Sequence, residues 1–218
     1  MKASVAFLVC LLLFSYLVFP ALCFFETVVT ITADELNQAY SSIYFHYPKS
    51  KKLTSHNSDK WKITITHDIV FGNDTQYWFE LCLHPKNKTD GQISPSDPLI
   101  FLKFQKYNNW VRIGLSNGSV VYFVYDGSYT LPLEITYVNR TFEVKGTSTL
   151  IKLTMFTDLY PHYVLYRISH NAEVCTAGSV IITYSDDPLE TVYPFIGLAI
   201  MIFLVVFIFE YMRRMGRG

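Results

Sequence analysis

The 218-residue sequence is short of charged side chains and has no excess of either sign. Charged residues make up 17% of the chain, against about 25% in an average globular protein. Eighteen Lys and Arg balance 18 Asp and Glu, so the basic footprint of a nucleic-acid-binding protein is missing. Half of the residues are hydrophobic, which excludes an intrinsically disordered chain.

Sequence signatures of catalysis are missing as well. Gly114-Leu115-Ser116-Asn117-Gly118 has the spacing Gly-x-Ser-x-Gly, but it runs from a predicted strand into a predicted hairpin turn and not into the helix of a nucleophile elbow. The chain has no His-Glu-x-x-His, no phosphate-binding glycine loop and no Cys-x-x-Cys. His67 and His162 fall on inward-facing strand positions and could pair around a metal, although two half-buried, hydrogen-bonded rings are the simpler expectation. Asp186 and Asp187 could contribute to a calcium site, but without further oxygen ligands a solvated spacer next to the membrane is the simpler expectation. We therefore expect a protein that is not an enzyme and that needs no metal or cofactor.

The N-terminus has the layout of a secretory signal peptide. Lys2 supplies a positive start, residues 5–19 are an apolar stretch, and Ala21 and Cys23 are the small residues that precede a cleavage site. We expect residues 1–23 to be removed before Phe24. The alternative is an uncleaved N-terminal anchor.

A second apolar segment lies close to the C-terminus. Residues 191–209 contain 19 consecutive uncharged residues, which as a helix reach roughly 28 Å, close to the hydrocarbon thickness of a bilayer. Arg213, Arg214 and Arg217 follow, and the positive-inside rule places them in the cytosol. This pattern predicts one transmembrane helix over 191–210, a basic tail over 211–218 and a type I orientation, with the lipid bilayer as a partner. A lipid-anchor signal is the alternative, but its apolar tail normally ends the chain.

Residues 24–190 then form a lumenal or extracellular domain, and two features agree with that side of the membrane. Cys82 and Cys175 are the cysteines left after signal cleavage, and in a secretory domain they are expected to form a disulfide, the alternative being two separate buried thiols. N-glycosylation sequons occur at turn-like positions, namely Asn73, Asn87, Asn117 and Asn139. The segment carries 14 basic and 17 acidic residues, so a polyanion such as heparin is not an expected ligand.

The pattern of short apolar runs predicts an all-β domain. Residues 61–69 alternate apolar and polar, with odd positions inward, and similar runs recur up to residue 184. Asn117-Gly118 and Asp126-Gly127 are strong hairpin signals, and they would place the hairpins at 117 and 139 at one end of the sheet. Residues 48–60 and 86–98 read as long loops, and only residues 33–40 read as a helix, capped by Thr32 or Asp34. We expect an antiparallel two-sheet sandwich of the jelly-roll or lectin-like kind.

The run WVRIGLSNGSVVYFVYDGSY resembles the hairpins of lectin-type and laminin-G-type sandwiches, on turn chemistry that other β proteins share. Several aromatic side chains fall on the face opposite the alternating core, where they could form a binding surface or pack on a further layer: Trp78, Phe123, Tyr125, Tyr129 and Tyr137.

These features predict a type I membrane glycoprotein of the plasma membrane that recognises a protein or glycan ligand without catalysis. An accessory subunit of an endoplasmic-reticulum membrane complex is the alternative, because a 19-residue span suits a thin membrane. A membrane-anchored hydrolase or lectin with a metal-assisted site is a third class.

Overall fold

The computed structural model describes residues 26–186, apart from 95, 117–119, 156 and 172, and the single positions 200, 202, 206, 207 and 213. Within these residues no helix has both the length and the apolar character that a bilayer crossing requires. The signal peptide over 1–23 lies outside the described residues. The predicted membrane span over 191–210 and the tail over 211–218 also lie outside the described residues, except for the five single positions given above. All three stay predictions.

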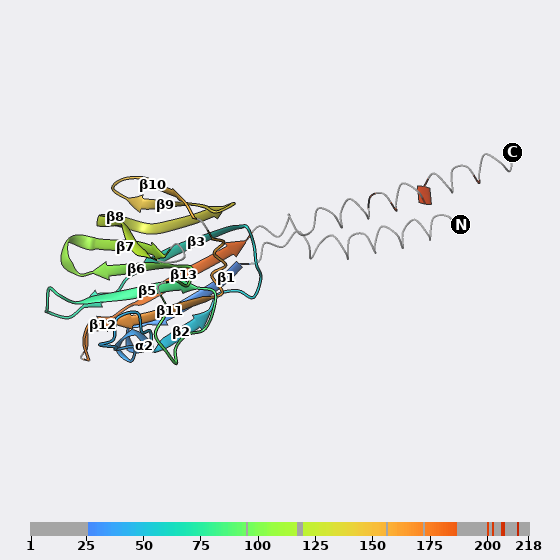
Figure 1. Cartoon of the computed structure of the whole chain (residues 1–218). Helices are drawn as coiled ribbons and strands as arrows, with labels where there is room; N and C mark the ends of the chain where they lie inside the picture. Colours follow the sequence, from blue (N-terminus) through green and yellow to red (C-terminus); the bar gives the residue numbers. More distant parts are fainter. Residues whose placement is uncertain are drawn as a thin grey trace, which may run out of the picture. The chain divides into compact units, whose positions relative to one another are not determined.

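Residues Glu26–Asp186 form one compact unit built almost entirely of antiparallel strands, as the sequence predicted (Figure 1). Eleven strands form two sheets, A and B, which share strand β8. Nine of them lie in one hydrogen-bonded order, and β9 and β10 branch from it at β8. Sheet A comprises β1 (Glu26–Thr32), β13 (Ser179–Asp186), β3 (Lys60–His67), the second half of β8 (Val121–Val138), β9 (Thr141–Thr147) and β10 (Ile151–Thr154). Sheet B comprises the first half of β8, β7 (Trp110–Ser116), β6 (Leu99–Gln105), β5 (Trp78–His84), β11 (Tyr163–Ile168) and β2 (Lys49–Lys52). A short ladder joins β12 (Cys175–Ala177) to β4 (Val70–Phe71).

Strand β8 passes from one sheet to the other, and this corrects a predicted turn. Asp126-Gly127 does not form a hairpin, because β8 stays paired with β7 through this stretch and Asp126 lies opposite Arg112. The strand changes sheet further on, where its pairing with β9 skips from Tyr129 to Glu134. Gly146 lies beside this irregularity with φ of 93°, and a Cβ there would meet two carbonyl oxygens of β8 at 2.7 Å.

The hairpins on either side of β8 therefore lie at opposite ends of that strand, and not at one end of the sheet as predicted. Residues 117–119 are outside the described residues, but Ser116 pairs with Val121 across them. At the other end, Asn139 and Arg140 have φ of 46° and 67° and join β8 to β9. Two consecutive positive φ values are typical of the tight turn that matches the twist of a hairpin.

The main core lies between the two sheets and follows the predicted alternation. In β3, Trp61, Ile63 and Ile65 are buried. Trp61 stacks on Tyr137 with ring centroids 5.0 Å apart, and its indole N–H donates to the Leu159 carbonyl at 3.0 Å. Buried aliphatic and aromatic side chains from both sheets complete this cluster. The burial of Tyr129 and Tyr137 assigns them to the core instead of to an outer binding surface.

The predicted helix exists but is shorter than expected. Helix α2 (Ala33–Asn37) begins after Thr32, whose hydroxyl accepts from the Glu35 amide at 3.3 Å while the Glu35 carboxylate accepts from the Thr32 amide at 2.9 Å. This reciprocal pair satisfies two amides that the first helical turn leaves open. The sequence therefore located the start of the helix correctly.

Strand β2 was predicted as part of a loop. Its sequence, KSKK, has no apolar alternation, yet it pairs with β11 and forms an edge of sheet B. Lysines are common on edge strands because they discourage pairing with another chain. In contrast, the described residues of 86–98 contain no strand, as expected for a loop.

The predicted disulfide is not formed. Cys82 and Cys175 are both free and buried, and they lie in two different hydrophobic clusters. Cys82 sits on the outer side of sheet B with Phe101 and Leu165, whereas Cys175 belongs to the core between the sheets. Burial raises the pKa of Cys175 to about 12 and that of Cys82 well above its ordinary value, so both thiols stay protonated.

We expect dithiothreitol to leave the unfolding midpoint of the chain unchanged. A disulfide across this loop of about 94 residues would contribute roughly 4–5 kcal/mol, so its reduction would produce a large drop. Alkylation in denaturant without reductant, followed by mass spectrometry, should label both Cys82 and Cys175. Protection of both thiols until reductant is added would show that the disulfide exists after all.

Candidate functional site

The register of sheet B places five charged side chains in one line across neighbouring strands. Arg167 on β11 lies opposite Glu80 on β5, Glu80 opposite Lys103 on β6, Lys103 opposite Arg112 on β7, and Arg112 opposite Asp126 on β8. These positions alternate with the core residues of each strand, so the line runs along the outer face of sheet B. We call Arg167, Glu80, Lys103, Arg112 and Asp126 the charged row.

The two ends of the charged row are ion pairs. Arg167 Nη2 lies 3.1 Å from Glu80 Oε2, with both side chains almost fully buried. Arg112 donates to one oxygen of Asp126 through Nη2 at 2.7 Å and through Nε at 3.0 Å, while the Trp110 indole donates to the other. Partial burial raises the pKa of Asp126, but these hydrogen bonds outweigh it and hold the pKa below its ordinary value. Both carboxylates of the row therefore already have hydrogen-bonding partners at their own end.

Lys103, at the centre of the row, is left without such a partner. Its Nζ has no hydrogen bond or ion pair among the described residues, and it lies 4.0 Å from the centroid of the Trp78 ring. Burial lowers the pKa of Lys103; Glu80 opposes that effect, whereas Arg112 and Arg167 reinforce it. The centre of the row is thus a half-buried cation with a cation on its β7 side.

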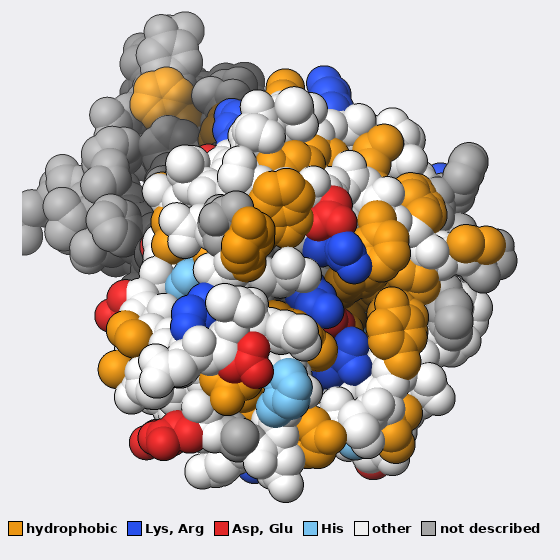
Figure 2. Space-filling model, turned by 90° about the vertical axis from the view of Figure 1, so that its left-hand side faces the viewer, with side chains coloured by type: hydrophobic (Ala, Val, Ile, Leu, Met, Phe, Trp, Pro, Cys, Tyr) orange, Lys and Arg blue, Asp and Glu red, His pale blue; other side chains and the backbone are white. Residues whose placement is uncertain are grey.

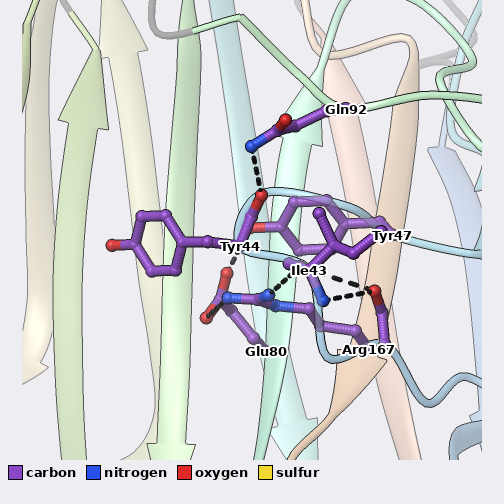
Figure 3. Close-up of polar contacts among 7 residues, drawn as sticks. Ile43, Tyr44, Tyr47, Glu80, Gln92 and Arg167 are labelled. Carbon is purple, nitrogen blue, oxygen red and sulfur yellow. Dashed lines mark hydrogen bonds and ion pairs between the residues drawn. The ribbon is translucent and has the colours of Figure 1, made fainter.

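A loop that precedes β2 covers one end of the row (Figure 3). Arg167 donates to the Ile43 carbonyl at 2.9 Å, and the Tyr47 hydroxyl donates to Glu80. Gln92 holds the loop from the other side by donating to the Tyr44 carbonyl at 2.7 Å. Burial, followed by the charge of Glu80, raises the pKa of Tyr47 well above its ordinary value, so this hydroxyl remains a donor.

At the other end of the row the side chains of Arg112 and Asp126 are 35% and 41% exposed, and an exposed aromatic ring lies near each end. Phe123 is 52% exposed, and the Arg112 guanidinium lies 4.9 Å from its centroid. Tyr44, on the covering loop, is 56% exposed and lies 5.5 Å from the Arg167 guanidinium. Figure 2 shows a hollow in which Lys and Arg side chains lie between hydrophobic ones. The described face therefore combines fixed charges with exposed rings on a rigid sheet.

Of the aromatic side chains predicted to form an outer surface, the structure brings Trp78 and Phe123 to this face. Tyr125 is half-buried and its hydroxyl donates to the Ser128 carbonyl. The charged row itself was missed, although a signal for it exists. Each of β5, β6, β7 and β11 is an apolar strand with a single charged residue: WFELCLH, LIFLKFQ, WVRIGLS and YVLYRI. Aligning these strands by register would have brought the charges together.

Three of the four predicted glycosylation sites lie at described positions. Asn73, Asn87 and Asn139 are exposed, which an acceptor requires, and Asn117 lies outside the described residues. The membrane-orienting residues Arg214 and Arg217 also lie outside them, and Arg213 is an exposed single position. Whether the sequons carry glycans, and whether these arginines orient the chain, stay predictions.

The two histidines considered as metal ligands have other partners. His67 Nε2 lies 2.5 Å from the Tyr129 hydroxyl, and His162 Nε2 lies 2.8 Å from Asn57 Oδ1. Within the described part of the chain, no three or more His, Cys, Asp and Glu side chains group as metal ligands would. Burial, opposed by the nearby Asp68, lowers the pKa of His67 to about 4.

This shift predicts a loss of stability in mild acid. Between about pH 6.5 and 4 the unfolded chain protonates His67 whereas the folded chain does not, so the free energy of unfolding falls as pH falls. The loss amounts to at most about 1.4 kcal/mol for each pH unit. Urea unfolding at several pH values should show this dependence, and His67→Phe should weaken it. An equal dependence in the variant would assign the effect to other groups.

Comparison of the sequence with protein families and with curated proteins finds no match. Solved structures show a distant likeness in fold. A fructofuranosidase from Schwanniomyces occidentalis bound to fructose has a TM-score of 0.42 and 15% identity over 74% of this chain. Sheep galectin-11 with glycerol has a TM-score of 0.36 and 12% identity over 61% of this chain and 94% of its own. The CBM2 module of the evolved Dit protein from Lactobacillus casei phage J-1 has a TM-score of 0.40 and 10% identity, over 63% of this chain and 69% of its own.

The chain spans only 34% of the length of the fructofuranosidase. Because each TM-score is below 0.5, we take nothing about a ligand or an activity from these proteins. The function of this chain is inferred instead from the charged row and its neighbouring rings.

Proposed function

We propose that this chain is a non-enzymatic recognition glycoprotein that binds carbohydrate on the outer face of sheet B, in the manner of a lectin. The observation that supports this proposal is the charged row, which is open at its Arg112–Asp126 end and bordered by the exposed rings of Phe123 and Tyr44. A sugar ring has apolar C–H faces and hydroxyl groups at its edge. A ligand of this kind needs apolar contact area together with a few fixed polar groups.

Three properties of the face favour a carbohydrate over a large protein partner. The ion pair between Arg112 and Asp126 fixes donors and acceptors in place before a ligand arrives. The exposed rings of Tyr44 and Phe123 are joined by two buried rings, Phe45 and Phe101, so little of the aromatic surface between them faces the solvent. The loop over Arg167 and Glu80 closes one end, which limits the length of the ligand.

The cellular setting of the proposal comes from the sequence. We propose a single-pass type I protein of the plasma membrane, with residues 24–190 outside the cell and the basic tail inside. Digestion of sealed vesicles with a protease should cut only the tail, and a glycosidase that removes N-glycans should increase mobility on a gel. Lasting sensitivity to endoglycosidase H would instead favour residence in the endoplasmic reticulum.

The binding proposal is tested on a glycan array with the full-length chain in a mild detergent. Phe123→Ala should weaken binding about tenfold, since an aromatic side chain at the centre of a binding site commonly contributes about 1.4 kcal/mol or more. Leu150→Ala is the matched control, because Leu150 is 64% exposed and lies between β9 and β10 in sheet A. No glycan bound by the wild-type chain, or equal losses in both variants, would refute the proposal.

A further inference from the structure

The charge balance of the row differs from that of an ordinary sheet surface. It contains three cations and two carboxylates, and each carboxylate is already paired with the cation at its own end. Lys103 and Arg112 stand directly opposite each other across β6 and β7. Like charges at directly opposed positions destabilise a sheet, so this arrangement costs the free protein stability.

The surroundings of Lys103 add to that cost. Its side chain is half-buried, and its ammonium contacts the face of Trp78 instead of a carboxylate. A cation that is partly removed from water and unpaired keeps an unused capacity for charge-assisted hydrogen bonds. An anionic group placed between Lys103 and Arg112 would accept hydrogen bonds from the Lys103 ammonium. It would also attract both cations and so offset the repulsion between them.

We propose that the ligand is an acidic sugar, with its carboxylate or sulfate held between the Lys103 ammonium and the Arg112 guanidinium. This inference rests on the proposed carbohydrate function and adds the class of ligand. The group is a single anion, since the whole of residues 24–190 has a slight excess of acidic side chains that disfavours a polyanion. The rings of Phe123 and Tyr44 flank the row and contact the body of the sugar.

The test compares matched oligosaccharides with and without the acidic group. Sialyllactose against lactose measures the contribution of a carboxylate, and sulfated lactose against lactose that of a sulfate. The array also carries other neutral glycans together with their sialylated and sulfated derivatives. The full-length wild-type chain should bind the acidic members about 10- to 100-fold more tightly, the range expected for a hydrogen bond to a charged group.

A pair of variants assigns this preference to the row. Lys103→Gln should abolish the preference, so that the acidic and the neutral member of each pair bind with about equal affinity. It should leave the unfolding midpoint the same or higher, because the repulsion from Arg112 is gone. Lys152→Gln, which removes a positive charge from exposed β10 in sheet A, is the control and should keep the preference.

The outcomes separate the inference from the proposed function. Equal binding of acidic and neutral members by the wild-type chain would overturn the acidic-sugar inference and leave carbohydrate binding intact. A preference that survives Lys103→Gln would overturn it as well. The absence of binding to any glycan would overturn the proposed function, and the inference with it.

Discussion

Replacement of Arg167 by methionine is expected to lower the free energy of unfolding by about 3–5 kcal/mol, the usual cost of removing one partner of a buried ion pair. The side chains of Arg167 and Glu80 are 5% and 3% exposed, so Glu80 cannot recover its hydration when the guanidinium is removed. The Ile43 carbonyl also loses the shortest of its hydrogen bonds, which loosens the loop over the row. Urea denaturation followed by tryptophan fluorescence measures the change.

Two further variants identify the cause of this loss. The double variant Arg167→Met with Glu80→Leu should recover most of the stability, because it leaves no unpaired charge behind. Arg140→Met breaks an exposed pair with Asp158 and should leave the free energy of unfolding nearly unchanged. A double variant as unstable as the single one would mean that packing, and not the unpaired carboxylate, is responsible.

Trp61→Ala is expected to cost about 3–5 kcal/mol, as large-to-small changes in a well-packed core do. Trp61 is 2% exposed, stacks on Tyr137 and closes the interior of the sandwich near Leu159. Trp61→Phe keeps most of the stack but leaves the Leu159 carbonyl without its donor, so a smaller loss is expected. Thermal unfolding by circular dichroism compares the two variants.

Trp110→Phe is the control for this series, because Trp110 is only half-buried on the outer face of sheet B. It should change stability much less than Trp61→Ala. If the two variants were equally unstable, the core between the sheets would not be the main source of stability.

The sequence predicted the features that depend on local patterning. Alternation in β3 placed Trp61, Ile63 and Ile65 inward, and the pattern around Thr32 located the start of α2. These predictions succeeded because each depends on side chains within a few residues of one another. The antiparallel all-β class followed from the number of such runs.

The failures share a different cause, which is pairing between distant segments. Asp126-Gly127 has the chemistry of a turn, but pairing with β7 keeps it in a strand. The KSKK segment becomes β2 only because β11 offers an edge. The predicted disulfide between Cys82 and Cys175 depended only on the number of cysteines left after signal cleavage. In the structure the two thiols lie on opposite faces of sheet B. The charged row depends on the register of five strands at once, which the pattern within one strand does not contain.

Fluorine NMR of the chain labelled with 5-fluorotryptophan tests the account most directly. The three tryptophans report on three places: Trp78 beneath Lys103, Trp110 beside Asp126 and Trp61 in the core. Titration with sialyllactose and sulfated lactose should shift the Trp78 resonance with at least one of the two sugars and leave that of Trp61 in place. A spectrum in which Trp78 does not respond to either acidic sugar, or in which only Trp61 moves, would contradict binding at the charged row.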